Sequence, residues 1–141
     1  RLSMRRFMVK RSNPEGLFNS KVYSQVATVS GNAKTIYVGG QNAINSEGQF
    51  VGQGDFEMQT KQALENIKIA LASENATFND VIKLNIYMVY GCDPAVGLKA
   101  FMETVGVLEK PPLITVLKVA GLANHQCLIE IEAVAAVEDV E

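Results

Sequence analysis

A run of alternating side chains near the C-terminus constrains the fold more than any other feature of the sequence. Between residues 127 and 137, one set of alternate positions holds Ile129, Ile131, Ala133 and Ala135, and the other holds Leu128, Glu130, Glu132 and Val134. Successive side chains of a strand point to opposite faces of a sheet, so a period of two predicts a strand. The chain is therefore expected to build a sheet with one aliphatic face and one mixed face.

Other strand-like runs supply the rest of this sheet. Residues 81–89 also alternate, and they are expected to form its central strand. Further strands are predicted at residues 4–10, 22–29, 35–38 and 113–119. A short turn at Ser30-Gly31-Asn32 favours a hairpin between the strands at 22–29 and 35–38.

Two helices are predicted between the strands. The first has apolar residues at three- and four-residue steps, namely Ala63, Leu64, Ile67, Ala70 and Leu71. The second begins at Asp93-Pro94 and continues with the same spacing towards Val105. The element order β-β-β-α-β-α-β-β indicates an α+β fold in which both helices cover one face of the sheet. Apolar residues at Val116, Leu128 and Val134 then favour contact of the other face with another subunit.

The length and charge of the chain exclude several classes of protein. A chain of 141 residues fits a single domain spanning residues 1–141. Its formal charge of -2 lacks the positive excess that nucleic-acid binding requires. A local basic cluster is interpreted as the solvated edge of an N-terminal strand, with RNA contact as the alternative; it comprises Arg1, Arg5, Arg6, Lys10 and Arg11.

The hydrophobic runs are shorter than the roughly 20 residues that span a bilayer, and no secretory signal is evident. We therefore expect a cytoplasmic protein with no membrane partner. Cys92 and Cys127 form no CxxC pair, and His125 is the single histidine. These residues predict neither a zinc site nor a nucleophile paired with a base.

Glu130 and Glu132 are the residues with the clearest chemical potential. They share one strand face among aliphatic neighbours. A carboxylate in apolar surroundings has a raised pKa unless other groups satisfy it, and it can then hold a water or move a proton. The alternative interpretation is a pair of acids on an exposed strand face.

Five segments, in this order and spacing, resemble the RidA family, also called YjgF/YER057c/UK114. They are residues 23–25 (YSQ), 37–41 (YVGGQ), 59–67 (QTKQALENI), 80–83 (DVIK) and 129–135 (IEIEAVA). The resemblance implies a chorismate-mutase-like α+β fold and a homotrimer, in which three sheets form a central barrel with clefts between subunits. Active members hydrolyse enamines and imines, such as 2-aminoacrylate, to 2-keto acids and ammonia without a cofactor.

The resemblance also implies which residues line the cleft. Tyr23 matches the family's cleft tyrosine, Gly40 the glycine of its Ser-Gly-Gln motif, and Glu130 the glutamate that positions the attacking water. Gly39 replaces the serine of that motif.

Two further cleft positions depart from the family pattern. Ile114 replaces the arginine of the family's Pro-Ala-Arg-Ser motif, which pairs with the substrate carboxylate. Leu98 falls where archetypal members have an asparagine. An aliphatic side chain cannot form the two-pronged hydrogen bond of a guanidinium, so this chain is identified as a divergent member that lacks the catalytic arginine.

Two functions are compatible with these residues. The lost arginine favours a homotrimer that binds a less acidic, more apolar metabolite in clefts between subunits, with deaminase activity weak or absent. The alternative is an active enamine/imine deaminase, a cofactor-free hydrolase with altered specificity. An RNA-cleaving translation inhibitor, an older label of the family, is disfavoured by the acidic charge balance and the single histidine. We expect the cleft between subunits to form a pocket with an apolar wall and one carboxylate, which suits a neutral or cationic ligand with a hydrogen-bond donor better than a free 2-imino acid. Its expected residues are Tyr23, Gly40, Leu98, Ile114 and Glu130.

Overall fold

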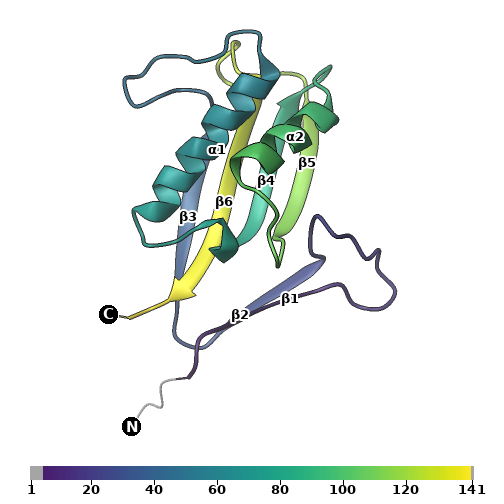
Figure 1. The fold of residues 1–141 in the computed structure, drawn as a ribbon, viewed down its shortest axis with the longest axis vertical. Helices are drawn as coiled ribbons and strands as arrows, with labels where there is room; N and C mark the ends of the chain where they lie inside the picture. Colours follow the sequence, from purple (N-terminus) through teal and green to yellow (C-terminus); the bar gives the residue numbers. More distant parts are fainter. Residues whose placement is uncertain (1–4, 141) are drawn as a thin grey trace.

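The computed structural model describes residues 5–140 and places two helices against one face of a four-stranded sheet (Figure 1). Met4, the predicted start of the first strand, and Arg1 of the basic cluster lie outside these residues. The strands are β1 (Met8–Ser12), β2 (Val26–Ser30), β3 (Ala33–Gln41), β4 (Val81–Val89), β5 (Leu113–Val119) and β6 (Ile129–Glu138). The helices are α1 (Phe56–Ala72), a short 3-10 turn η1 (Phe78–Asp80) and α2 (Pro94–Thr104). The predicted α+β class and element order are confirmed.

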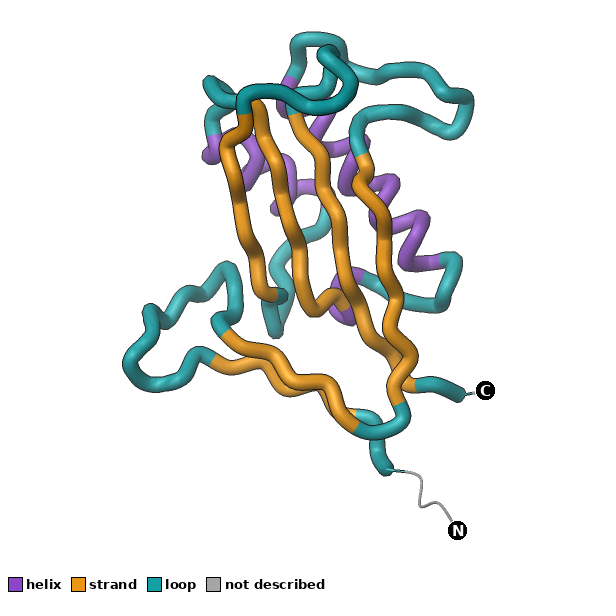
Figure 2. The backbone as a smooth tube through the Cα atoms, turned by 180° about the vertical axis from the view of Figure 1, so that it is seen from behind, coloured by secondary structure: helices purple, strands orange, loops and turns teal. Residues whose placement is uncertain are grey.

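The four-stranded sheet has the order β3-β6-β4-β5. Strand β6 pairs antiparallel with both β3 and β4, whereas β4 and β5 run parallel. Figure 2 shows this sheet from behind, where no helix covers it. Strands β6 and β4 are therefore both interior. The sequence predicted a central position for β4 alone.

The core lies between the sheet and α1. The aliphatic face of β6, with Ile129 and Ile131, packs in one cluster with Leu64, Ile67 and Leu71 of α1. These five side chains are almost completely buried. The predicted helical stripe of α1 and the predicted aliphatic face of β6 are thus confirmed.

The predicted hairpin between residues 22–29 and 35–38 is wrong. Strand β2 pairs with β1 in a separate two-stranded sheet, and β3 pairs with β6. The turn between β2 and β3 instead carries the chain from one sheet to the other (Figure 1). Asn32 fixes this crossing because its backbone N–H donates to the carbonyl of Arg5 (3.1 Å) and its side chain donates to the carbonyl of Asp139 (2.7 Å).

The interpretation of the basic cluster as a solvated strand edge does not hold for Arg11. Its guanidinium donates to the carbonyl oxygens of Asn79 (3.1 Å) and Val81 (2.8 Å). Burial lowers the pKa of this guanidinium from its usual value. Arg11 therefore joins the two-stranded sheet to the beginning of β4.

No helix within residues 5–140 has the length and apolar character that crossing a membrane requires.

A buried amide connects the first turns of α1 to the segment that leads into β6. Gln59 is fully buried, and its side-chain NH2 donates to the carbonyls of Gly52 (2.9 Å) and Gln126 (3.1 Å). Its side-chain oxygen accepts from the backbone N–H of Leu128 (2.8 Å). Since Leu128 directly precedes β6, these bonds fix where that strand begins.

Replacing Gln59 with leucine tests this connection. Gln59→Leu leaves two carbonyls and one N–H without their partner, so we expect the free energy of unfolding to fall by about 2 to 4 kcal/mol. Urea denaturation measures the change. Gln62, which bonds only Asn66 of the same helix, is the matched control, and Gln62→Leu should cost less than about 1 kcal/mol. Equal losses for the two variants would contradict the role of Gln59.

Candidate functional site

The five predicted site residues fall into two groups on opposite faces of the four-stranded sheet. Tyr23, Leu98 and Ile114 line an apolar cavity on the face that the helices cover. Glu130 lies on the other face of β6, next to Gly40 of β3. Within one chain the sheet therefore separates the two groups, and the expected cleft between subunits stays a prediction.

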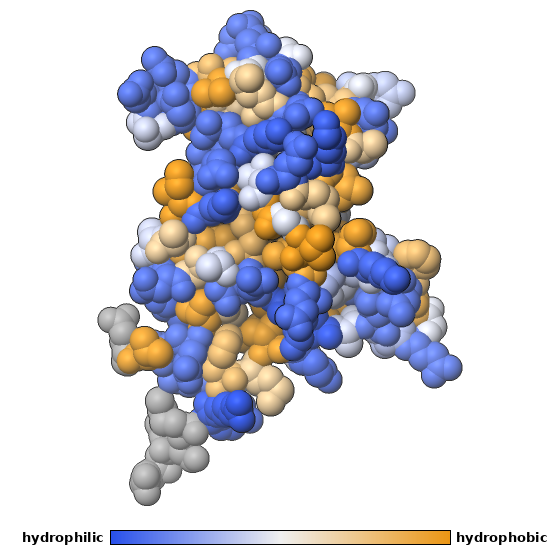
Figure 3. All heavy atoms as spheres, viewed as in Figure 1, coloured by the Kyte–Doolittle hydropathy of each residue, from blue (hydrophilic) through white to orange (hydrophobic). Residues whose placement is uncertain are grey.

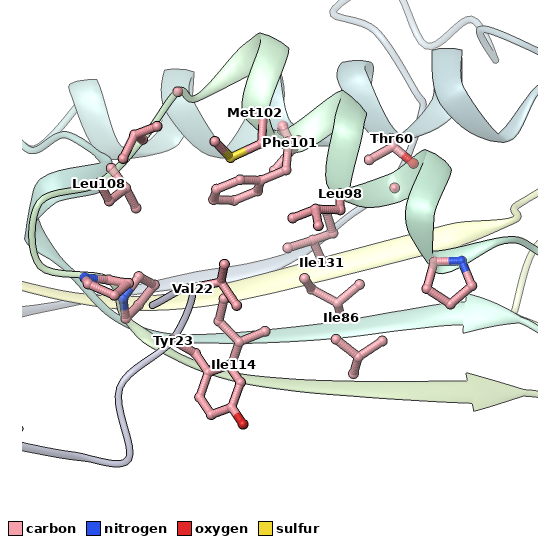
Figure 4. Close-up of a pocket in the computed structure, with 18 of the residues that line it drawn as sticks. Val22, Tyr23, Thr60, Ile86, Leu98, Phe101, Met102, Leu108, Ile114 and Ile131 are labelled. Carbon is pink, nitrogen blue, oxygen red and sulfur yellow. The ribbon is translucent and has the colours of Figure 1, made fainter. Parts of the chain in front are cut away.

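The cavity has a volume of about 290 Å³ and lies between α2 and strands β4, β5 and β6 (Figure 4). The N-terminal segment at 21–23 and the loop at 106–112 complete its wall. The sheet side is formed by Ile86, Met88, Ile114, Val116, Ile129 and Ile131, and the α2 side by Pro94, Gly97, Leu98, Phe101 and Met102. Val116, which we expected on the uncovered face, thus faces the cavity instead.

Ile114 is half-buried and packs against the main core cluster. Leu98 of α2 is 52% exposed and lies opposite the strands, across the cavity from Ile114 (Figure 4). Apolar side chains also reach the surface on this side of the molecule, as Figure 3 shows, and those that line the cavity include Met102 and Val107. The cavity therefore opens to solvent through an apolar mouth.

Tyr23 reaches the cavity because the next residue is tied to the loop before β5. The hydroxyl of the buried Ser24 donates to the carbonyl of Pro111 (2.6 Å), and its backbone N–H donates to the carbonyl of Pro112 (3.0 Å). Tyr23 consequently lies beside Ile114, with its hydroxyl directed away from α2 (Figure 4).

Charged groups are scarce in the cavity wall. Among residues 5–140, Lys21 is the single ionisable residue of the wall apart from Tyr23, and no arginine or acidic residue of this range lines it. Thr60, the polar residue on the α1 side, uses its hydroxyl to donate to the carbonyl of Phe56 (2.7 Å). The cavity is thus suited to a hydrocarbon body with its polar end at the mouth.

Glu130 and Gly40 are in direct contact on the other face of the sheet. A Cβ atom at Gly40 would clash with the Oε2 atom of Glu130, whereas one at Gly39 would meet nothing within 4 Å. The pairing of β3 with β6 is irregular between Val38 and Gln41, so Gly40 lies in the irregular stretch. The absence of a side chain at Gly40 makes room for the carboxylate of Glu130.

Glu132 belongs to a polar cluster that sequence reasoning missed. Its Oε1 atom accepts hydrogen bonds from the hydroxyl of Tyr87 (2.7 Å) and the side-chain NH2 of Asn85 (3.1 Å). The bond from Tyr87, and then that from Asn85, lowers the pKa of Glu132, while Glu132 in turn raises the pKa of Tyr87. These partners satisfy Glu132, so it does not behave as an acid isolated among aliphatic residues. The alternation of residues 81–89 could have predicted this cluster, because it places Asn85 and Tyr87 on one face of the strand.

A second hollow, of about 310 Å³, lies beside this cluster. Its wall includes Tyr37, Lys83, Asn85 and Glu132. The ammonium group of Lys83 donates to the hydroxyl of Thr115 (2.8 Å). The described part of the chain, residues 5–140, brings together no group of three or more His, Cys, Asp or Glu side chains that could hold a metal ion.

Comparisons with known proteins agree with this architecture. The family model described as endoribonuclease L-PSP matches residues 17–137. A RutC family protein of Pyrococcus abyssi is 37% identical over 113 residues, which cover 80% of this chain and 84% of the relative. A protein of Dermatophagoides farinae named 2-iminobutanoate/2-iminopropanoate deaminase is 31% identical over 99 residues, 63% of this chain and 75% of that one.

The fold is also similar to a solved structure. The conserved Rid family protein YyfB of Yersinia pestis, whose function is unknown, superposes with a TM-score of 0.79 at 30% identity. The similarity covers 92% of this chain and 98% of the other. With the family model spanning most of the sequence, the chain belongs to the RidA/YjgF family, whose model bears the description endoribonuclease L-PSP.

Proposed function

We propose that this protein is a homotrimer that binds a small metabolite in clefts between its subunits, and that its enamine/imine deaminase activity is weak or absent. The proposal places it in the cytoplasm and needs no cofactor, nucleic acid or membrane.

The position of Ile114 carries the proposal. In the family resemblance this position belongs to the arginine that pairs with the substrate carboxylate. Here an aliphatic side chain takes its place among apolar neighbours, in a cavity with no arginine in its wall. Removing water from a carboxylate next to Ile114 costs free energy, and this aliphatic side chain forms no hydrogen bond that compensates for the cost. A small imino acid therefore gains little binding free energy from this wall. A ligand with an apolar body gains binding free energy because its apolar surface is removed from water.

Two observations support assembly into a trimer. The helix-free face of the sheet exposes Tyr37 (79%) and Leu117 (48%) next to its polar groups, which fits contact with another subunit. In addition, the sheet separates Glu130 from Ile114 within one chain. A cleft that contains both positions would need two copies of the chain.

Two observations favour the alternative, an active deaminase with altered specificity. The contact between Glu130 and Gly40 is intact, so the residue that positions water in active members has the space it needs. Similarity to a protein named 2-iminobutanoate/2-iminopropanoate deaminase points the same way. The endoribonuclease of the family's description receives less support, because His125 is the single histidine in the chain.

The oligomeric state tests the proposed assembly. Light scattering on a sizing column should give three times the 15.3 kDa mass of the chain at micromolar concentration. A stable monomer under these conditions would contradict the proposal.

Turnover of 2-aminoacrylate tests the proposed loss of activity. The loss of the charge pair should raise the activation free energy by on the order of 2 to 5 kcal/mol. The value of kcat/KM should then be roughly thirtyfold to several thousandfold lower than that of an arginine-bearing relative. A dehydratase that generates the enamine provides the coupled assay. Ile114→Arg should recover part of the rate, and Leu117→Arg, on the other face of β5, should not. Turnover of the unaltered protein at the level of the relative would decide for the active deaminase.

The contact between Gly40 and Glu130 gives a matched pair of variants. Gly40→Ala places a methyl group against the flexible carboxylate of Glu130, which must swing away, so any residual deaminase rate should fall at least tenfold. Gly39→Ala meets open space and should keep the rate. The free energy of unfolding of both variants should lie within about 1 kcal/mol of that of the parent protein. Equal rates in the two variants would show that Glu130 takes no part in the reaction.

A further inference from the structure

We propose that the hollow on the helix-free face of the sheet is a second binding site, which takes small primary amines in their ammonium form. Glu132 accepts a hydrogen bond from the ammonium group, and Tyr37 forms an aromatic wall for the body of the amine. This inference goes beyond the proposed function, because it concerns neither the apolar cavity nor the ligand that we propose for it.

Three strands build the hollow on the sheet face that no helix covers (Figure 2). Tyr37 and Gly39 come from β3, Glu132 from β6 and Asn85 from β4, where Asn85 is the direct partner of Glu132. A Cβ atom at Gly39 would meet nothing within 4 Å, so the space over this glycine is open within residues 5–140. The volume of about 310 Å³ lies at the lower limit of small-molecule pockets, so the ligand is small.

Glu132 offers a carboxylate oxygen that is available to a cation. Tyr87 and Asn85 both donate to its Oε1 atom, and they hold the side chain towards β4. Within residues 5–140, no hydrogen bond uses its Oε2 atom and no ion pair involves Glu132. The bond from Tyr87, and then that from Asn85, lowers the pKa of Glu132, so the carboxylate is ionised at pH 7. An oriented anion without a counter-ion favours an ammonium group, which donates a charge-assisted hydrogen bond.

Lys83, the one cationic residue that lines the hollow among residues 5–140, does not supply the missing counter-ion. Its ammonium group donates to the hydroxyl of Thr115 on β5 (2.8 Å), whereas Glu132 lies on β6, on the other side of β4. Neighbouring strands lie about 4.8 Å apart, so β5 and β6 are roughly 10 Å apart. The charge beside the open space of the hollow is therefore that of Glu132, which attracts a cation and repels a carboxylate.

Tyr37 determines which cations gain most from this site. Its side chain is 79% exposed, and in the pairing of β3 with β6 it is the direct partner of Val134, another lining residue. The face of an aromatic ring attracts a cation, and the ring also covers hydrocarbon from water. Inorganic ammonium gains only the charge interactions, whereas an amine with a short apolar body gains contact with Tyr37 and Val134 as well. The ligand class is therefore a primary amine with a small aryl or alkyl group.

Tyrosine ring signals allow a test that distinguishes the two sites. Tyr37 lines the hollow, Tyr23 lines the apolar cavity and Tyr90 lines neither. In protein that carries 13C-labelled tyrosine, 2-phenylethylamine at pH 7 should shift the signal of Tyr37 and leave those of Tyr23 and Tyr90 unchanged. The neutral analogue 2-phenylethanol should bind the hollow about threefold to tenfold more weakly, as a partly exposed charge pair beside an aromatic ring allows.

A charge-removing variant tests the role of Glu132. Glu132→Gln keeps an oxygen for the two donors on β4 and removes the negative charge. It should weaken binding of the amine threefold to tenfold and leave the affinity for the alcohol unchanged. Glu138→Gln, at the exposed end of the same strand and outside the hollow, is the matched control and should change neither affinity. Unchanged Tyr23 and Tyr90 signals in the ligand-free variants report that they are folded.

Two results would overturn the inference. One is an affinity for 2-phenylethylamine that Glu132→Gln leaves unchanged. The other is a Tyr37 signal that the amine does not shift, together with a lower mass of Glu132→Gln in light scattering, which would assign the hollow to a cationic side chain of a second copy. Neither result bears on the ligand of the apolar cavity, which the Tyr23 signal reports separately.

Discussion

The register of strand β6 is the constraint on which the rest of the structure depends. This strand is hydrogen-bonded to β3 on one side and to β4 on the other, so its register is held by two ladders. A slip of one residue would turn Glu130 and Glu132 into the core under α1 and expose Ile129 and Ile131. Burying two carboxylates there costs several kcal/mol each unless each finds a partner. The same constraint that forms the core thus places Glu130 against Gly40 and Glu132 against Tyr87.

The alternation of side chains along β6 also determines which residues of one chain can act on the same ligand. Ile129 and Ile131 form part of the cavity wall, and Glu130 between them points to the opposite face. A ligand in the cavity cannot exchange a proton with Glu130 of the same chain, because the sheet lies between them. Acid–base chemistry by Glu130 on a ligand that touches Ile114 would therefore need the cavity of one copy next to the helix-free face of another.

The sequence predicted the elements whose pattern is local, and it failed where partners are distant. The stripe on α1 and the alternation of β6 follow from side chains that repeat along a single element. The turn at Ser30-Gly31-Asn32 specifies a change of direction and not a partner, and hydrogen bonds from Asn32 to Arg5 and Asp139 decide the pairing. Arg11 has no local signal either, since its acceptors are carbonyls about 70 residues away. The family resemblance named the five site residues, but a set of cleft residues carries no information about which face of one chain each occupies.

If Ile114 stands where other family members have an arginine, as we propose, the source of the binding free energy changes. An arginine at this position would lie among hydrocarbon side chains, and in the unliganded protein its charge would lack a partner at a cost of several kcal/mol. Ile114 instead packs, half-buried, against the core cluster, so it contributes less to folding than the about 1.5 to 3 kcal/mol of a fully buried isoleucine. With the strong two-pronged charge pair gone, affinity must come chiefly from buried hydrocarbon, at about 25 cal/mol for each Å² of apolar surface removed from water. Under the proposed function, the cavity would select ligands by the size and shape of their apolar body first and by their charge second.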